Sequence, residues 1–101
     1  MVEAIILCLD EADLVKESVW RLRKDCDKII VVDNGSSEEQ KEILRGIKDI
    51  TLVDLPENKG ISNGRNAGLA VSTREYVFLL DGDILYVPGS IPKLMEEMKK
   101  C

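Results

Sequence analysis

Apolar residues along this chain fall into short continuous runs that alternate with segments of helical spacing. The runs at 4–9, 28–32, 50–55 and 75–80 are typical of buried strands. Between and after them, apolar positions three and four residues apart predict helices over 10–24, 61–72 and 91–100. A further helix is predicted to start within 36–40, where Ser36 with Glu39, or Ser37 with Gln40, could form a capping box.

Strands that alternate with helices predict a parallel sheet covered on both faces and joined by right-handed crossovers. The expected fold is therefore an α/β, Rossmann-like three-layer sandwich with a mainly parallel four-stranded sheet in the order 3-2-1-4. Residues 1–101 fit one domain of ordinary size. In the third helix Gly64 and Gly68 lie four residues apart. Because glycine disfavours helix, this pair indicates close packing against backbone or a ligand.

The composition of the chain argues against several kinds of binding and catalysis. The formal charge of −5 argues against a nucleic-acid binder, which needs a basic surface. The absence of His removes imidazole catalysis and His metal sites, and three widely spaced Cys predict reduced thiols in a cytoplasmic protein. No run approaches the roughly 20 apolar residues of a membrane span, so no span is expected.

Polar residues follow each predicted strand, where the carboxyl ends of a parallel sheet form its ligand-binding rim. Asp10 follows the first strand, Asp33 and Asn34 the second, 57–60 the third, and Asp81-Gly82-Asp83 the fourth. A glycine turn can bring two acids together, and converged carboxylates suit Mg²⁺ or Mn²⁺ holding a substrate's phosphates. The other interpretation of each motif is a polar turn or helix cap that only ends a strand.

Three motifs in sequence carry a family resemblance. They are the run 29–36 ending in Asp33-Asn34-Gly35-Ser36, the segment 58–68 with Asn58-Lys59-Gly60, and the run 75–83. Together they resemble the N-terminal, donor-binding half of family 2 glycosyltransferases, of truncated GT-A type. The resemblance implies a nucleotide-diphosphate sugar as ligand, a divalent cation, and transfer of the sugar to an acceptor hydroxyl.

Site residues follow from the same resemblance. Asp33 and Asn34 match the acidic position that accepts a hydrogen bond from the nucleobase, and Asp81 and Asp83 match the DxD motif, whose last acid coordinates the cation. Arg65 matches an arginine expected to contact the diphosphate or nucleotide. At the end of the first strand, Leu9 stands in a run that in the family packs on the nucleobase, although here it reads Leu-Cys-Leu-Asp.

The family places its acceptor site and catalytic base in a C-terminal half, and this chain offers no evident base, so the catalytic residue is left unknown. A non-catalytic nucleotide-binding or remnant domain is the alternative. A haloacid-dehalogenase-type phosphohydrolase is a third interpretation, since an apolar strand leads into Asp81, but only 18 residues follow Asp83. In the family further strands extend the sheet beyond the fourth, so we expect an unpaired edge here and a homodimer formed through it.

Overall fold

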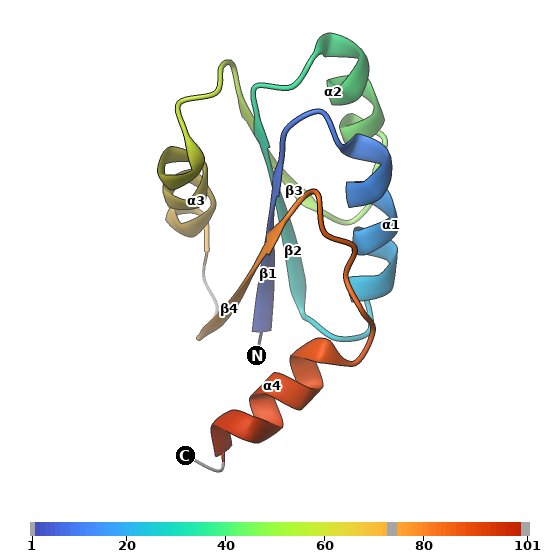
Figure 1. The fold of residues 1–101 in the computed structure, drawn as a ribbon, viewed down its shortest axis with the longest axis vertical. Helices are drawn as coiled ribbons and strands as arrows, with labels where there is room; N and C mark the ends of the chain where they lie inside the picture. Colours follow the sequence, from blue (N-terminus) through green and yellow to red (C-terminus); the bar gives the residue numbers. More distant parts are fainter. Residues whose placement is uncertain (1, 73–74, 100–101) are drawn as a thin grey trace.

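The computed structural model describes residues 2–72 and 75–99 and shows strands and helices in strict alternation (Figure 1). The elements are β1 (Val2–Cys8), α1 (Ala12–Leu22), β2 (Lys28–Asn34), α2 (Glu38–Arg45), β3 (Thr51–Leu55), α3 (Ile61–Ala70), β4 (Tyr76–Asp81) and α4 (Ser90–Lys99). The predicted order of elements is confirmed, and most boundaries move by only one to three residues.

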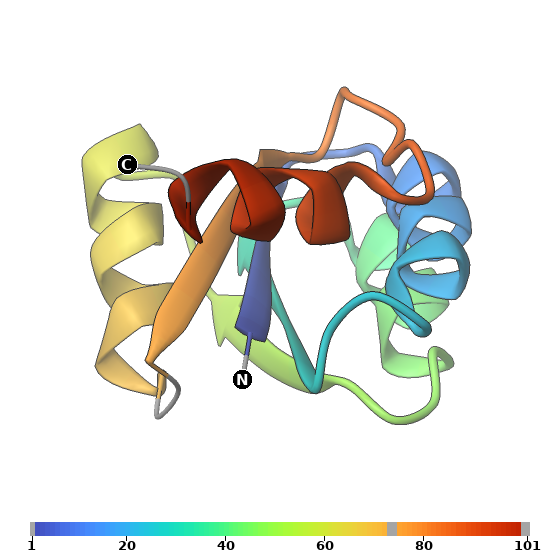
Figure 2. The same cartoon turned by 90° about the horizontal axis from the view of Figure 1, so that it is seen from below.

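The four strands form one sheet in the order β3-β2-β1-β4, and every neighbouring pair is parallel. Right-handed crossovers explain the layers: the chain moves outward from β1 through β2 to β3, then returns to the far side of β1 to form β4. Reversing direction puts the crossover helix on the other face. Accordingly α1 and α2 cover one face and α3 covers the opposite one (Figures 1 and 2). The predicted α/β architecture and strand order are confirmed.

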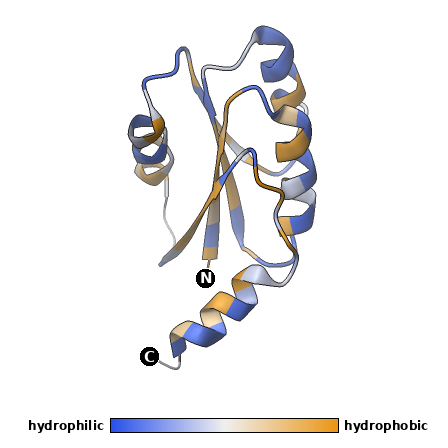
Figure 3. Ribbon diagram, in the orientation of Figure 1, coloured by the Kyte–Doolittle hydropathy of each residue, from blue (hydrophilic) through white to orange (hydrophobic). Residues whose placement is uncertain are grey.

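Each face of the sheet buries its own apolar cluster, because successive strand side chains point to opposite sides. Ala4, Ile6 and Val31 pack toward α1, whereas Ile5 and Val32 pack toward α3. The apolar colour runs along the strands in Figure 3, while each helix shows both apolar and polar residues. Apart from the buried Glu3, β1 is apolar, because helices cover both faces of the sheet.

The two glycines of α3 let this helix lie close to the sheet, although the atoms nearest to them belong to side chains of β1 and β2 and not to the backbone or ligand that their spacing predicts. A Cβ atom on Gly68 would stand 2.7 Å from Ile5 Cγ2 and 3.1 Å from Val32 Cγ2. One on Gly64 would stand 3.3 Å from Leu7 Cδ2 and 3.5 Å from Asn34 Nδ2. The backbone of α3 therefore approaches β1 and β2 at a distance that larger residues would prevent.

Two local expectations are wrong. Neither capping box forms: Ser37 is the N-cap of α2 without a side-chain cap bond, and Gln40 Oε1 instead accepts a hydrogen bond from Ala12 N at 2.8 Å. A tertiary contact to the start of α1 has replaced the local one. Ser36 is also used elsewhere, since its Oγ accepts a hydrogen bond from Asp10 N at 2.9 Å.

A buried tyrosine fastens α4 to the rest of the molecule. Tyr86 Oη donates to Asp25 Oδ2 at 2.6 Å and accepts from Ile91 N at 3.0 Å, while Gly89 N donates to the same Asp25 oxygen at 2.8 Å. Burial, with the hydrogen bond to Asp25, raises the pKa of Tyr86 to about 12. The ring packs edge-on against Phe78 with 5.8 Å between centroids. The first turn of α4 is thereby held against β4 and the loop that follows α1.

β4 lies at one edge of the sheet and β3 at the other. On the outer part of β4 and the turn after it, Leu79 and Ile84 are exposed. Across the described residues, no helix has the length and apolar character needed to cross a membrane.

Candidate functional site

A cavity of about 290 Å³ opens at the carboxyl ends of β1, β2 and β4, beside the first residues of α3. It lies next to the boundary between β1 and β4, where strand order reverses and open α/β sheets bind their ligands. Its lining residues are Leu7, Cys8, Leu9, Glu11, Asn34, Asn58, Gly60, Ile61, Asp81, Gly82 and Asp83.

The turn that carries the two acids is fixed by a close backbone contact. Asp81 ends β4 in register with Leu7, and Gly82 N then donates to Leu7 O at 2.7 Å. A Cβ atom on Gly82 would stand 2.4 Å from the same Leu7 oxygen, so only glycine fits here. This contact closes the end of β4 against β1 and places Asp81 and Asp83 on the cavity wall.

Asn34 contributes a buried polar group to the same wall. Its Nδ2 donates to Asn58 Oδ1 at 3.1 Å and to Gly60 O at 3.4 Å. Its Oδ1 is buried and has no hydrogen-bond partner among the described residues. A buried acceptor left unpaired costs about 1–3 kcal/mol. The bonding capacity of this amide oxygen is therefore unused within the described residues, and Asn34 itself lines the cavity.

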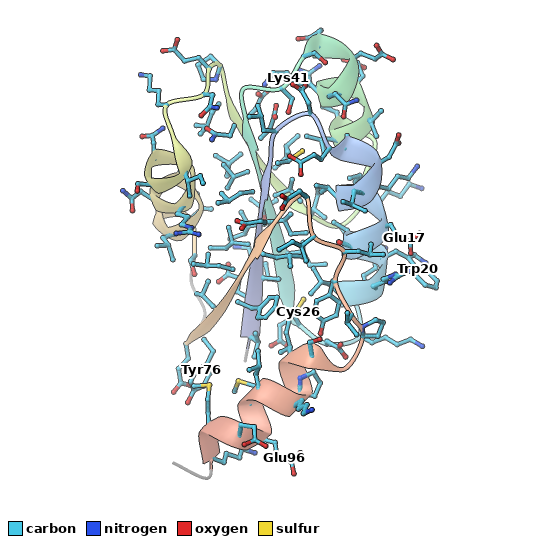
Figure 4. The ribbon with its side chains drawn as sticks, in the orientation of Figure 1. Glu17, Trp20, Cys26, Lys41, Tyr76 and Glu96 are labelled. Atoms are coloured by element: carbon cyan, nitrogen blue, oxygen red, sulfur yellow. The ribbon has the colours of Figure 1, made fainter. Side chains whose placement is uncertain are left out.

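Asp33 occupies the opposite face of β2. Its carboxylate accepts a hydrogen bond from Lys41 Nζ at 2.5 Å and from Ser36 N at 3.1 Å, and it does not line the cavity. Lys41 also contacts Asp54, and Figure 4 shows its side chain beside α2, on the side of the sheet away from α3. Because successive strand residues alternate in direction, Asp33 and Asn34 cannot both face one ligand from a regular strand.

The positive charge of Lys41 lies between two carboxylates, those of Asp33 and Asp54. Burial alone would lower the pKa of Lys41, but hydrogen bonds and charge interactions with Asp33 and Asp54 outweigh burial and raise it. The hydrogen bond from Lys41 in turn lowers the pKa of Asp54. The charge of Lys41 is therefore used within the fold, to tie α2 to the ends of β2 and β3.

Glu11 is a third carboxylate of the cavity that sequence reasoning did not assign. Burial and the nearby charge of Asp83 raise the pKa of Glu11, and its Oε2 has no hydrogen-bond partner among the described residues. The residue before it, Asp10, adopts the left-handed conformation with φ of 56°, and its Oδ1 accepts from Ser37 N at 2.8 Å. Asp10 therefore fixes the loop, and Glu11 faces the cavity. Glu11 comes directly after Asp10, which is expected at the rim, and this position in the sequence could have pointed to it.

The remaining predicted residues divide between the cavity and the outer surface. Leu9 lines the cavity. Arg65 is exposed on α3 and is not among the lining residues, and Lys59 pairs with Glu57 at 3.6 Å on the surface. The cavity thus brings together Leu9, Asn34, Asp81 and Asp83 and leaves out Asp33 and Arg65.

The carboxylates of the cavity do not by themselves enclose a metal ion. Among residues 2–72 and 75–99 no group of three or more Cys, Asp or Glu side chains is arranged to hold one. A cation such as Mg²⁺ can take only one or two carboxylates from a protein and complete its coordination with phosphate oxygens and water. Asp81 and Asp83 have the right donor atoms for that mode.

Comparison with known proteins places these features in a family. Residues 3–101 match the sequence profile described as "Glycosyl transferase family 2". The chain is 32% identical over 101 residues to the poly-beta-1,6-N-acetyl-D-glucosamine synthase of Staphylococcus aureus strain MSSA476, covering 94% of this chain and 24% of that synthase. The synthase of the same name from Staphylococcus epidermidis is 31% identical over 102 residues, covering 95% of this chain and 25% of that protein.

A crystal structure of a mycobacterial protein shares the fold. It superposes with a TM-score of 0.81 at 20% identity and covers all of this chain and 37% of its own. This likeness supports the predicted GT-A-type architecture and says nothing of activity. The chain spans about a quarter of the length of its staphylococcal relatives. The match over almost its whole length shows that this chain belongs to glycosyl transferase family 2.

Proposed function

We propose that this chain is the donor-binding part of a glycosyltransferase and that its cavity holds a nucleotide-diphosphate sugar together with Mn²⁺ or Mg²⁺. The observation that supports this most directly is the convergence of Asp81, Asp83 and Asn34 on one cavity, with the side-chain oxygen of Asn34 left unpaired among the described residues. Family membership makes transfer of the sugar to an acceptor hydroxyl the reaction to expect.

Different residues would contact different parts of the ligand. Asp81 and Asp83 would hold the cation against the diphosphate, where it neutralises the charge that develops on the departing nucleoside diphosphate. Asn34 would accept a hydrogen bond from the nucleobase, and Leu9 would pack against the base from the end of β1. The positive φ of 98° at Gly60 lets the chain turn into α3 beside the cavity without a side chain in the way.

The relatives guide the choice of donor. Both staphylococcal proteins are named as synthases of a polymer of N-acetyl-D-glucosamine. A nucleotide-activated N-acetylglucosamine is therefore the first donor to test. Release of free sugar or transfer by this chain would support an active enzyme, whereas donor binding without turnover would support the non-catalytic alternative.

Calorimetric titration tests the binding proposal. UDP, GDP and TDP are titrated into the parent chain with and without Mn²⁺, and then into Asp83→Asn, which keeps the size of the side chain and removes its charge. We expect at least one nucleotide to bind in the presence of Mn²⁺, and the substitution to weaken that binding by about tenfold or more, since a metal ligand is lost.

The matched control is Asp49→Asn, the same change at a residue outside the cavity lining. Asp49 has a φ of 59°, which asparagine also tolerates. This variant should bind as the parent does. Equal heats for the parent and Asp83→Asn would remove the metal from the proposal, and no binding of any nucleotide would contradict the proposal as a whole.

A further inference from the structure

Asn58 holds two groups of the cavity wall with one side-chain oxygen. Its Oδ1 accepts a hydrogen bond from Gly60 N at 2.8 Å and another from Asn34 Nδ2 at 3.1 Å. Gly60 O lies 3.4 Å from the same Asn34 nitrogen. A side chain at Gly35 would collide with this turn, because its Cβ would stand 2.5 Å from Asn58 N. The end of β2 and the turn before α3 are thus closely joined.

This contact determines which way the amide of Asn34 points. A backbone N–H can only donate and a backbone carbonyl can only accept. Gly60 N therefore requires the oxygen of Asn58, and Gly60 O and Asn58 Oδ1 together require the nitrogen of Asn34. Exchanging the two ends of the Asn34 amide would place its oxygen against two acceptors.

The consequence is an acceptor of fixed orientation in the cavity wall. Asn34 is only 7% exposed, and its Oδ1 lacks a partner among the described residues. A ligand that donates an N–H to this oxygen is matched, and one that presents a lone pair is repelled. Uracil, thymine and guanine carry a ring N–H on the edge that pairs with another base, whereas cytosine and adenine carry a ring acceptor there.

We propose that Asn58 is a positioning residue that sets nucleobase choice at this site: it occupies the nitrogen end of the Asn34 amide and leaves the oxygen end for the ligand, so that bases with a ring N–H are preferred. The proposal rests on the proposed function, since it concerns the nucleotide bound in the same cavity. It goes beyond that function by naming the residue and the polarity that select the base.

UDP and CDP are the matched probes, because they share ribose, diphosphate and ring and differ in the polarity of this edge. The affinities of both are measured by calorimetry at one Mn²⁺ concentration for the parent, Asn58→Ala and Asn58→Asp. We expect the parent to prefer UDP by about tenfold or more, the size of one unmatched buried acceptor. In Asn58→Ala only the longer contact with Gly60 O still favours the nitrogen, so the Asn34 amide is held less firmly and the ratio should fall. Asn58→Asp keeps an acceptor oxygen and should restore the ratio.

Repeating the Asn58→Ala substitution in an Asn34→Asp variant distinguishes loss of amide positioning from general loss of structure. The carboxylate of Asn34→Asp has two acceptor oxygens, so turning it over changes nothing. Adding Asn58→Ala to Asn34→Asp should leave the ratio of UDP to CDP affinity unchanged, even where both affinities fall. Circular dichroism confirms that each variant is folded, and the parent ratio alone tests base preference if Asn58→Ala does not fold.

Each failure has a separate meaning. Equal affinity of the parent for UDP and CDP would overturn this inference and leave nucleotide binding intact. An equal drop in the ratio in both Asn34 backgrounds would show that Asn58 acts only through the general structure of the loop. Binding of neither UDP nor CDP to the parent would overturn this inference, and the proposed function as well if GDP and TDP also fail to bind.

Discussion

Lys41 is a buried cation whose partners come from two neighbouring strands. Its Nζ donates to Asp33 Oδ2 at 2.5 Å, to Asp54 and to Leu55 O at 3.1 Å. Asp33 is fully buried, and its other oxygen accepts from Ser36 N. Taking charges out of water is costly, so a buried carboxylate is tolerated here only because its cation is present. The cluster fixes the end of β2 one residue before Asn34.

Replacing Lys41 by methionine should therefore be strongly destabilising. Lys41→Met fills a similar volume but leaves the carboxylate of Asp33 buried without a cation, which typically costs about 3–5 kcal/mol. Adding Asp33→Asn removes the stranded charge and keeps an acceptor for Ser36 N, so the double variant should recover much of the lost stability. Urea unfolding followed by circular dichroism measures all three chains.

The exposed Lys93 provides the control for this pair. Lys93→Met should change the free energy of unfolding by no more than about 0.5 kcal/mol, as is usual for surface positions. If Lys41→Met and the double variant proved equally unstable, the loss would come from the missing amine contacts and not from an unpaired buried charge.

The sequence predicts which residues lie at the rim of the sheet better than it predicts which way their side chains point. The residues that follow the strands were expected at the rim, and Leu9, Asn34, Asp81 and Asp83 line the cavity there. The family resemblance implies that Asp33 and Asn34 bind together, although a regular strand sends these two side chains to opposite faces. Which of the two faces the ligand depends on α3 crossing the side of the sheet opposite α1, and that is a property of the whole topology.

A long side chain can form its hydrogen bond with a distant element, so a local sequence motif does not always predict its partner. The capping box at the start of α2 was the natural local interpretation, but Gln40 extends to Ala12 N in α1. Trp20 is 72% exposed, and Figure 4 shows it pointing outward from α1 beside Glu17. The partner of Gln40 could not be inferred before the distance between α1 and α2 was known.

At the scale of elements, α3 is placed by its glycines more than by its own helix preference. It has no side-chain cap and carries two glycines, which disfavour helix in isolation. In exchange, its backbone can lie directly on β1 and β2, with Gly68 against Ile5 and Val32. Because the first turn of α3 borders the cavity, this close packing also sets the distance between Gly60 and Asn34.

Gly68→Ala should destabilise the protein although alanine favours helix. The added Cβ would stand 2.7 Å from Ile5 Cγ2, and overpacking of this kind costs about 1–3 kcal/mol. The gain in helix preference offsets about 1 kcal/mol at most. We therefore expect a net loss in the free energy of unfolding, measured by urea denaturation.

Gly46→Ala is the matched substitution at a helix end with space. The nearest atom to its added Cβ is Ile43 O at 3.5 Å, an ordinary contact, and its φ of −82° suits alanine. This variant should be as stable as the parent or slightly more so. A Gly68→Ala chain as stable as Gly46→Ala would mean that α3 does not lie as close to the sheet as described.

For the whole molecule, strand order follows from chirality once the elements are known. Right-handed crossovers with a single reversal put α1 and α2 on one face, α3 on the other, and the cavity at the reversal point. The sequence therefore predicted the position of the cavity correctly. The polar turn after β3 was recognised, but the contact of Asn58 with Asn34 was not, since it joins residues 24 positions apart.

The unpaired side of β4 carries the last prediction, that two copies associate through this edge. An edge strand with exposed apolar side chains is a template for pairing with another strand, and Leu79 is 44% exposed on β4. Sedimentation velocity over a wide concentration range should show a monomer–dimer equilibrium. Leu79→Lys should shift it to monomer, because a charge on an edge opposes pairing. Trp20→Lys changes a more exposed apolar residue on α1, away from that edge, and should leave the equilibrium unchanged. A parent chain that sediments as a monomer at every concentration would refute the dimer, and equal effects of both substitutions would place its interface elsewhere.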